Sequence, residues 1–238
     1  MLTLSHSVVR GGLLIQNFYT GDSDDDPKGG PTIRATLAYN LFYQAGMRAA
    51  AGDEGTDGGF VMLHTVGNVF RESGGNLQLR GAVGRDGLRT VGNRLVVISE
   101  SDTFGESPHN IFLTVGAGLA VGNSVRAEFF DSRFIRDSPD TPPEFQIIGG
   151  DEGADPDGAS NNHASILITG ATVETSDGVA VEGGLSITDE IGSGDLPNTA
   201  RLEGTRRNFL LNNQGLPAPP EHFFLEPWSE SRTTIARS

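Results

Sequence analysis

The chain has 238 residues, a formal net charge of -14 and no cysteine. This acidity disfavours nucleic acid and anionic membranes as partners, because both would repel the chain at long range. Without cysteine there are no disulfides, thiolate nucleophiles or cysteine-based zinc sites, and no stretch approaches the ~20 apolar residues that a membrane span needs.

Seven segments share one pattern, in which apolar and polar residues alternate and a bulky apolar residue comes last. They are LTLSHSVV (2–9), TIRATLAYNLF (32–42), FVMLHTVGNVF (60–70), RLVVISESDTF (94–104), VRAEFFDSRF (125–134), SILITGATV (165–173) and ARLEGTRRNF (200–209). The last residues, which we call anchors, are separated by 28 to 39 residues; they are Val9, Phe42, Phe70, Phe104, Phe134, Val173 and Phe209. Such spacing indicates a solenoid repeat with insertions of variable length.

Other positions repeat at fixed distances before the anchors. Seven residues before them, every residue is apolar: Leu2, Ala35, Leu63, Val97, Ala127, Ile166 and Leu202. Five residues before them, the residues are mostly apolar or small: Leu4, Leu37, Thr65, Ser99, Phe129, Ile168 and Gly204. Alternation of this kind places both columns on the inner face of a strand.

Two residues before the anchors, the column is mostly small and polar. It consists of Ser7, Asn40, Asn68, Asp102, Ser132, Ala171 and Arg207. Such residues mark turns, and stacked copies of them would form polar ladders.

A second β-like run and a glycine-rich loop usually follow each anchor, and glycine occupies 33 positions in all. Strand, turn, second strand and a short third segment make up one turn of a three-sided solenoid. We therefore predict an all-β fold, a right-handed parallel β-helix of about seven coils over residues 1–225, with a C-terminal tail over 226–238. A jelly roll also offers many short strands, but it has no reason to repeat anchor and turn columns.

The segments RNFLLNNQG, SRFIRDSP and GNVFRESGG resemble the coil endings of the pectin-lyase-like superfamily of right-handed β-helices. The resemblance implies an extracellular, cell-surface or virion-surface protein, although the N-terminal stretch has no signal-peptide pattern. That superfamily contains enzymes that cut acidic polysaccharides, and also tailspikes, adhesins and non-catalytic surface proteins. The leading hypothesis is a protein that engages polysaccharide, as a binding surface, hydrolase or lyase; the alternative is a structural or assembly module.

Charged residues occupy several outward positions of the predicted strands and the turns that follow. We expect Glu100 and Glu128, on adjacent strands, to hold their carboxyl groups roughly 6 to 9 Å apart, which suits the acid and base of an inverting glycosidase. Asp102 and Asp131 would extend this acidic patch. The candidate substrate-binding residues are Arg133, His64 and Arg206. Ordinary solvated residues on a sheet face are the alternative interpretation.

Acidic loops at 21–30 and 52–59 belong to consecutive coils and should be neighbours. Their carboxylates could supply the oxygen ligands that calcium prefers; these residues are Asp22, Asp24, Asp26, Asp53, Glu54 and Asp57. Plain acidic turns are the alternative.

Three apolar residues, Ile98, Phe130 and Leu167, share outward columns with the glutamates. A fully solvated sheet face should not show them, so they predict cover by a loop, by the tail or by another subunit. A homo-oligomer or larger assembly is therefore one expected state of the protein.

Overall fold

The computed structural model describes the backbone of residues 1–17, 30–52, 56–72, 77–81, 90–105, 109–114, 120–136, 144–148, 161–169, 172–175, 183–188, 199–203, 209–211 and 223–224. Side chains are described for 1–17, 30–52, 56–72, 77–81, 90–105, 120–135 and 161–169. Within this part of the chain, no helix is long and apolar enough to cross a membrane.

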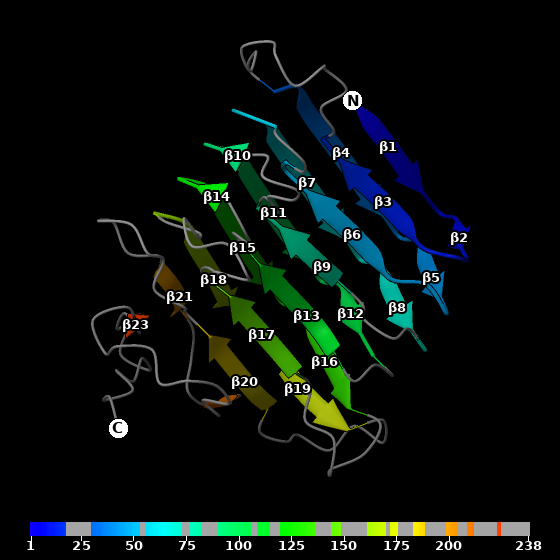
Figure 1. The fold of residues 1–238 in the computed structure, drawn as a ribbon. Coiled ribbons are helices and arrows are strands. Elements are labelled where there is room, and N and C mark those ends of the chain that lie inside the picture. The colour runs from blue at the N-terminus through cyan, green and yellow to red at the C-terminus, as the bar shows by residue number, and fades with distance from the viewer. Residues whose placement is uncertain are drawn as a thin grey trace.

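The molecule is a parallel β-helix with three walls, each a parallel sheet (Figure 1). The first sheet contains β1 (Leu2–Ser5), β4 (Thr32–Ala38), β7 (Phe60–Val66), β11 (Arg94–Glu100), β15 (Ser124–Phe130), β18 (His163–Thr169), β21 (Thr199–Glu203) and β23 (Phe223–Phe224). The second contains β2 (Val8–Val9), β5 (Leu41–Tyr43), β8 (Val69–Arg71), β12 (Thr103–Phe104), β16 (Arg133–Arg136) and β19 (Thr172–Thr175). The third contains β3 (Leu13–Gln16), β6 (Met47–Ala50), β9 (Leu77–Arg80), β13 (His109–Thr114), β17 (Glu144–Ile148), β20 (Gly183–Thr188) and β22 (Phe209–Leu211).

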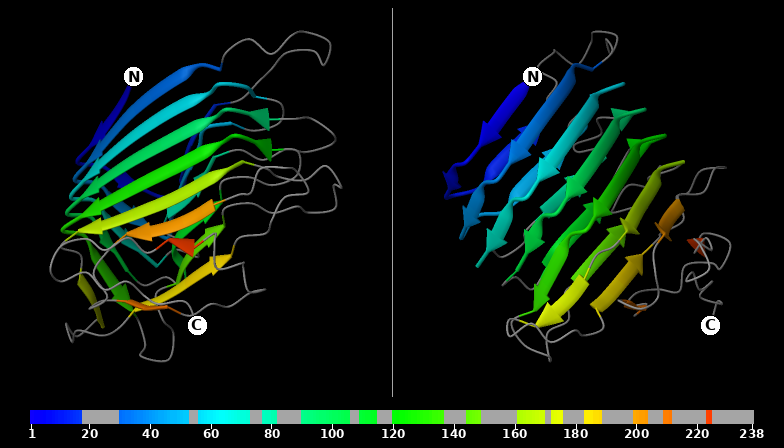
Figure 2. Two further views of the ribbon diagram at one scale, coloured as in Figure 1. Left: turned by 90° about the vertical axis from the view of Figure 1, so that its left-hand side faces the viewer. Right: turned by 180° about the vertical axis from the view of Figure 1, so that it is seen from behind.

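The coils follow one another in chain order, so that β1 lies at one end of the stack and β21 and β23 lie toward the other (Figure 2). Among the described residues, six successive coils have a strand in all three sheets, and the coil of β21 and β22 has none in the second. A separate pair of short strands, β10 (Thr90–Val91) and β14 (Ala120–Val121), precedes β11 and β15. The predicted parallel β-helix is confirmed.

The register of the first sheet follows the predicted inner columns. Leu2, Ala35, Leu63, Val97, Ala127, Ile166 and Leu202 are successive partners along the sheet. The second inner column is confirmed from Leu4 to Ile168, while Gly204 lies outside the described residues. Alternate residues of β7, β11, β15 and β18 are buried, as period-2 patterning requires.

The anchors of the second sheet form a stack of aromatic rings in the interior. Phe42, Phe70, Phe104 and Phe134 are fully buried, with ring centroids 4.4, 5.0 and 5.1 Å apart in that order. Phe129 of the first sheet meets the last two rings edge-on. Offset and edge-on contacts between rings add to the free energy gained by burying their area.

Phe209 is an exception, and its predicted place in this stack is wrong. It pairs with Gly183 in the third sheet. In the sequence, the residue two before Phe209 is the long, charged Arg207, where the earlier coils have a small residue. Residues 204–208 lie outside the described part of the chain.

Two polar ladders run along the corners of the helix. In the first ladder, Ser7, Asn40, Asn68 and Asp102 are linked coil to coil, each backbone N–H donating to the side chain of the next residue. In each coil the residue before the ladder position, from His6 to Asp131, is left-handed, with φ between 49° and 60°. A polar ladder of these turn residues was predicted, whereas its place between the first two sheets comes from the structure.

The second ladder was not predicted. Gly59, Asn93, Asn123 and Asn162 are linked in the same way at the start of the first-sheet strands. The residue before each of them is again left-handed, which is why glycine or asparagine stands there. The sequence does contain a signal for this ladder. A glycine followed by an asparagine stands directly before a strand in VGNRL and again in VGNSV.

Candidate functional site

The outward side chains of β4, β7, β11, β15 and β18 form one continuous surface, which we call the outer face. They are the even-numbered residues of the first four strands and the odd-numbered residues of β18. Parallel strands in register place equivalent residues of successive coils side by side, about 4.8 Å apart. A ligand lying across the strands would therefore contact several coils.

Glu100 and Glu128 lie on this face with the predicted offset. Glu100 is the register partner of Phe130, and Glu128 is the register partner of Ile98, so that the two glutamates are displaced by two residues on adjacent strands. This arrangement brings both carboxylates to the same region of the outer face.

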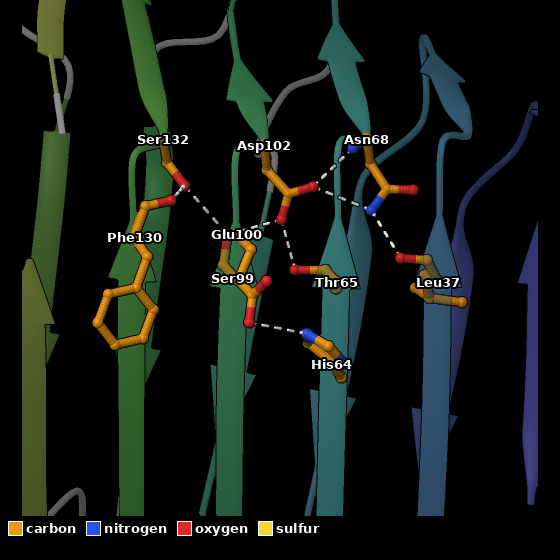
Figure 3. A network of polar contacts seen from close by, with 9 residues as sticks. All are labelled: Leu37, His64, Thr65, Asn68, Ser99, Glu100, Asp102, Phe130 and Ser132. Carbon is orange, nitrogen blue, oxygen red and sulfur yellow. Dashed lines mark hydrogen bonds and ion pairs between the residues drawn. The ribbon is translucent and has the colours of Figure 1, made fainter. Parts of the chain in front are cut away.

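Each glutamate has a basic partner of its own. Glu100 Oε1 lies 3.2 Å from His64 Nε2, as Figure 3 shows, and about half of the Glu100 side chain is exposed. Glu128 Oε1 accepts a hydrogen bond of 2.5 Å from Arg126 Nε and is the less exposed of the two. Sequence reasoning missed Arg126, although Arg126 and Glu128, two residues apart on one strand, necessarily point the same way.

The outer face is richer in positive charge than the chain as a whole. Its described side chains include Arg34, Arg94 and Arg126 against only Glu100 and Glu128 as acids, whereas the formal net charge of the chain is -14. The Arg94 guanidinium also stacks over the Phe60 ring, with its central carbon 5.9 Å from the ring centroid. Arginines therefore outnumber acids by one among the described side chains of this face, in contrast to the acidity of the chain, and this local balance favours anionic over cationic ligands.

The outward apolar residues Ile98, Phe130 and Leu167 are partly buried. Phe130 stands beside Glu100 in the register, and Leu167 beside Glu128. The outer face therefore mixes charged and apolar side chains within a few ångströms of one another.

Two other predicted site residues lie where the chain passes from the first sheet to the second. Asp131 is exposed and left-handed, and Arg133, at the start of β16, is also exposed. Arg206 lies outside the described residues.

Asp102, which we expected in the outer acidic patch, is placed in the interior instead. Its side chain is fully buried, although its neighbour Glu100 is exposed. The left-handed residue Ser101 separates them and turns the chain, so that strand alternation does not continue from Glu100 to Asp102. Its position in the first ladder, two residues before an anchor, already indicated an inward side chain.

Of the six candidate calcium ligands, five lie outside the described residues: Asp22, Asp24, Asp26, Asp53 and Glu54. Asp57 is described, and its Oδ1 accepts a 2.7 Å hydrogen bond from the backbone N–H of Val91. Within the described part of the chain, no three histidine or acidic side chains gather as a metal site would require. The calcium site stays a prediction.

No protein-family model, curated protein or solved structure matches this chain. The fold is established by the order and register of the sheets. The resemblance to the pectin-lyase-like superfamily lies in the coil endings of the sequence and assigns the chain to no family.

Proposed function

We propose that the protein binds an acidic polysaccharide along the outer face of the first sheet, at a cell or virion surface. The observation that carries this proposal is the excess of arginine over acid on that face of a chain with a net charge of -14. Guanidinium groups bind carboxylates through paired hydrogen bonds, so that Arg94 and Arg126, on adjacent strands, suit uronic-acid units. Kinship with the pectin-lyase-like β-helices is part of the same proposal.

The surroundings of the arginines support a sugar ligand over a simple anion. Phe130 offers part of its ring for contact with the apolar face of a pyranose. Glu100, beside Phe130 in the register, and its partner His64 carry donors and acceptors for hydroxyl groups. Phe130 and Glu100 lie at the C-terminal ends of their strands, four residues beyond the row of Arg126, so a polymer running obliquely over several coils would meet both sets of side chains.

The test is binding of polygalacturonate, a uronic-acid polymer, compared with a neutral glucan by calorimetry. We expect the wild type to bind the uronate polymer with an affinity that falls as salt rises, because screening weakens exposed charge pairs. The double variant Arg94→Ala/Arg126→Ala should bind at least ~10-fold more weakly, a loss of about 1.4 kcal/mol. Arg71→Ala is the matched control, since Arg71 is an exposed arginine of the second sheet. Equal affinities of wild type and double variant would overturn the proposal.

Cleavage of the bound polymer is a second candidate function, favoured by the offset of Glu100 and Glu128 on adjacent strands. One carboxyl group would protonate the leaving oxygen while the other activates water. Glu128→Gln should abolish release of reducing ends while leaving the thermal transition nearly unchanged. If the wild type releases no product from either polymer, the outer face only binds.

Assembly is the alternative, favoured by the partly exposed apolar residues Ile98, Phe130 and Leu167. It predicts a concentration-dependent oligomer in sedimentation experiments that Leu167→Asp dissociates. A monomer at all concentrations would exclude contact between copies through this face.

A further inference from the structure

The first ladder contains one carboxylate among amides. Asp102 occupies the position that Asn40 and Asn68 hold in the two preceding coils, and its side chain is fully buried. Figure 3 shows its carboxylate between β7 and β11, above the His64–Glu100 pair. Asp102 is buried, whereas Glu100 is exposed and His64 is partly exposed.

Four hydrogen bonds converge on this carboxylate. Oδ1 accepts from the backbone N–H of Asn68 at 2.6 Å and from Asn68 Nδ2 at 3.0 Å. Oδ2 accepts from the hydroxyls of Thr65 at 2.5 Å and Ser99 at 2.6 Å. An ionised carboxylate only accepts, so all four partners must donate.

The ladder therefore has a direction. Asn40 Nδ2 donates to Asn68 Oδ1, and Asn68 Nδ2 donates to Asp102 Oδ1. An asparagine side chain accepts one hydrogen bond through its oxygen and donates another through its nitrogen. An ionised carboxylate has no hydrogen to donate, so the series of side-chain hydrogen bonds ends at Asp102.

The neighbouring hydroxyls can also serve a protonated Asp102. Ser99 Oγ lies 3.4 Å from Ser132 Oγ, and either could donate. If Oδ2 carries a proton and donates a hydrogen bond to Ser99 Oγ, the hydrogen of the Ser99 hydroxyl can turn toward Ser132. Ser132 keeps its own donor for the carbonyl of Phe130.

Among the described residues, Asp102 has hydrogen bonds to uncharged groups only. Its contacts come from β7 through Thr65, from the turn before β8 through Asn68, and from β11 through Ser99, and all are uncharged. Burial raises the pKa of Asp102 and is the largest cause, outweighing the hydrogen bonds from Ser99, Thr65 and Asn68 that lower it.

Ionisable residues of the same elements lie on the solvent side. On β7 and β11 these are His64, Glu100 and Arg94; His64 and Glu100 pair with each other on the outer face, and Arg94 is exposed at the start of β11. Beside Ser132 they are Asp131 and Arg133, which are exposed.

We propose that Asp102 is a proton-controlled joint that links three successive coils of the solenoid. Ionised, it holds the Thr65 and Ser99 hydroxyls as donors. When a proton from water adds to Oδ2, the carboxyl group donates to Ser99, and the Ser99 hydroxyl turns to Ser132 in the next coil. The hydrogen bond between Asp102 and Ser99 thereby reverses its direction, while the path of the backbone stays the same.

The effect on stability has a definite sign. With its pKa raised in the folded state, Asp102 keeps its proton at pH values where the unfolded chain has already lost it. The free energy of unfolding contributed by this group therefore falls as the pH rises from the ordinary aspartate range through the folded pKa. Asp102→Asn, which cannot ionise, lacks this dependence and can still accept from Asn68.

The test is urea unfolding of the full chain between pH 4 and pH 7.5, comparing wild type with Asp102→Asn. We expect the unfolding midpoint of the variant to rise relative to that of wild type as the pH increases. Asp131→Asn, at the exposed turn of the next coil, is the matched control and should follow wild type. Parallel pH profiles of wild type and Asp102→Asn would overturn the proposal.

Carbon-13 NMR of the wild-type carboxyl groups gives a second readout that needs no variant to fold. The proposal requires one aspartate carboxyl to titrate above the ordinary aspartate range, with Cβ shifts of Ser99 and Thr65 changing in step. If every aspartate carboxyl titrates at or below that range, the proposal is wrong.

Discussion

The Phe134 ring is fully buried, 5.1 Å from the Phe104 ring and edge-on to Phe129 at 5.8 Å. Phe134→Ala removes these contacts and leaves a cavity, so we expect the free energy of unfolding to fall by about 3–5 kcal/mol. Urea unfolding measures this. Phe130→Ala, on the outer face and partly exposed, should cost less; equal losses would contradict the stacked core.

Asn123 joins two neighbouring coils through its side chain. Its Oδ1 accepts from the backbone N–H and the Nδ2 of Asn93, at 2.9 and 3.0 Å. Asn123→Ala leaves these buried donors without their acceptor, which costs about 1–3 kcal/mol for each unsatisfied group. Chemical denaturation should show this loss. The adjacent outward variant Ser124→Ala should unfold like wild type, and a similar loss there would contradict a specific role for the ladder.

At the scale of elements, the turn between β6 and β7 is packed too closely for any side chain at Gly59. An added Cβ would lie 2.3 Å from the carbonyl oxygen of Ala51 and 2.8 Å from Asn93 Oδ1. Gly59 also begins the second ladder, since its N–H donates to Asn93 Oδ1 at 2.8 Å. The strand β7 therefore starts where glycine allows this contact.

Gly59→Ala should lower the thermal midpoint, because the Ala51 carbonyl belongs to the backbone and the Asn93 side chain cannot withdraw without losing its bonds to Thr56 and Asn123. Overpacking of this kind typically costs 1–3 kcal/mol. Gly105→Ala is the matched control, since the nearest atom to its added Cβ is a side-chain atom of Ile135 at 3.4 Å. If calorimetry gives the two variants the same thermal midpoint, the close packing at Gly59 does not determine the stability of the folded state.

On the scale of the whole molecule, the net charge of -14 opposes folding through self-repulsion. Salt screens this repulsion, so raising sodium chloride from ~10 mM to ~300 mM should raise the thermal midpoint. Differential scanning calorimetry checks the shift. A midpoint that falls with salt would mean that attractive pairs such as His64 with Glu100 outweigh the repulsion.

Calcium should raise the thermal midpoint further if the loops at 21–30 and 52–59 bind it, because a ligand of the folded state alone stabilises that state. The comparison is calcium chloride against sodium chloride at equal ionic strength, followed by chelator. Asp53→Asn/Glu54→Gln should remove the difference. Equal midpoints in the two salts would leave these loops as plain acidic turns.

The sequence alone determined the wall of the first sheet, its inner columns and the first ladder. These features depend on local alternation and on turn residues, which repeat in each coil. Parallel stacking in register then places equal positions side by side, as with Leu63, Val97 and Ala127. The offset of Glu100 and Glu128 followed from the same register.

Only the tertiary structure decided where the chain departs from this repeat and how the side chains pair. Phe209 joins the third sheet although its distance from Val173 fits the repeat, because the period of a pattern does not specify which sheet a residue enters. Asp102 is buried because the left-handed Ser101 reverses its side, and Glu128 meets Arg126 through a side-chain contact that register leaves open. Periodicity specifies which face a residue occupies, whereas turn geometry and side-chain contacts specify what it meets there.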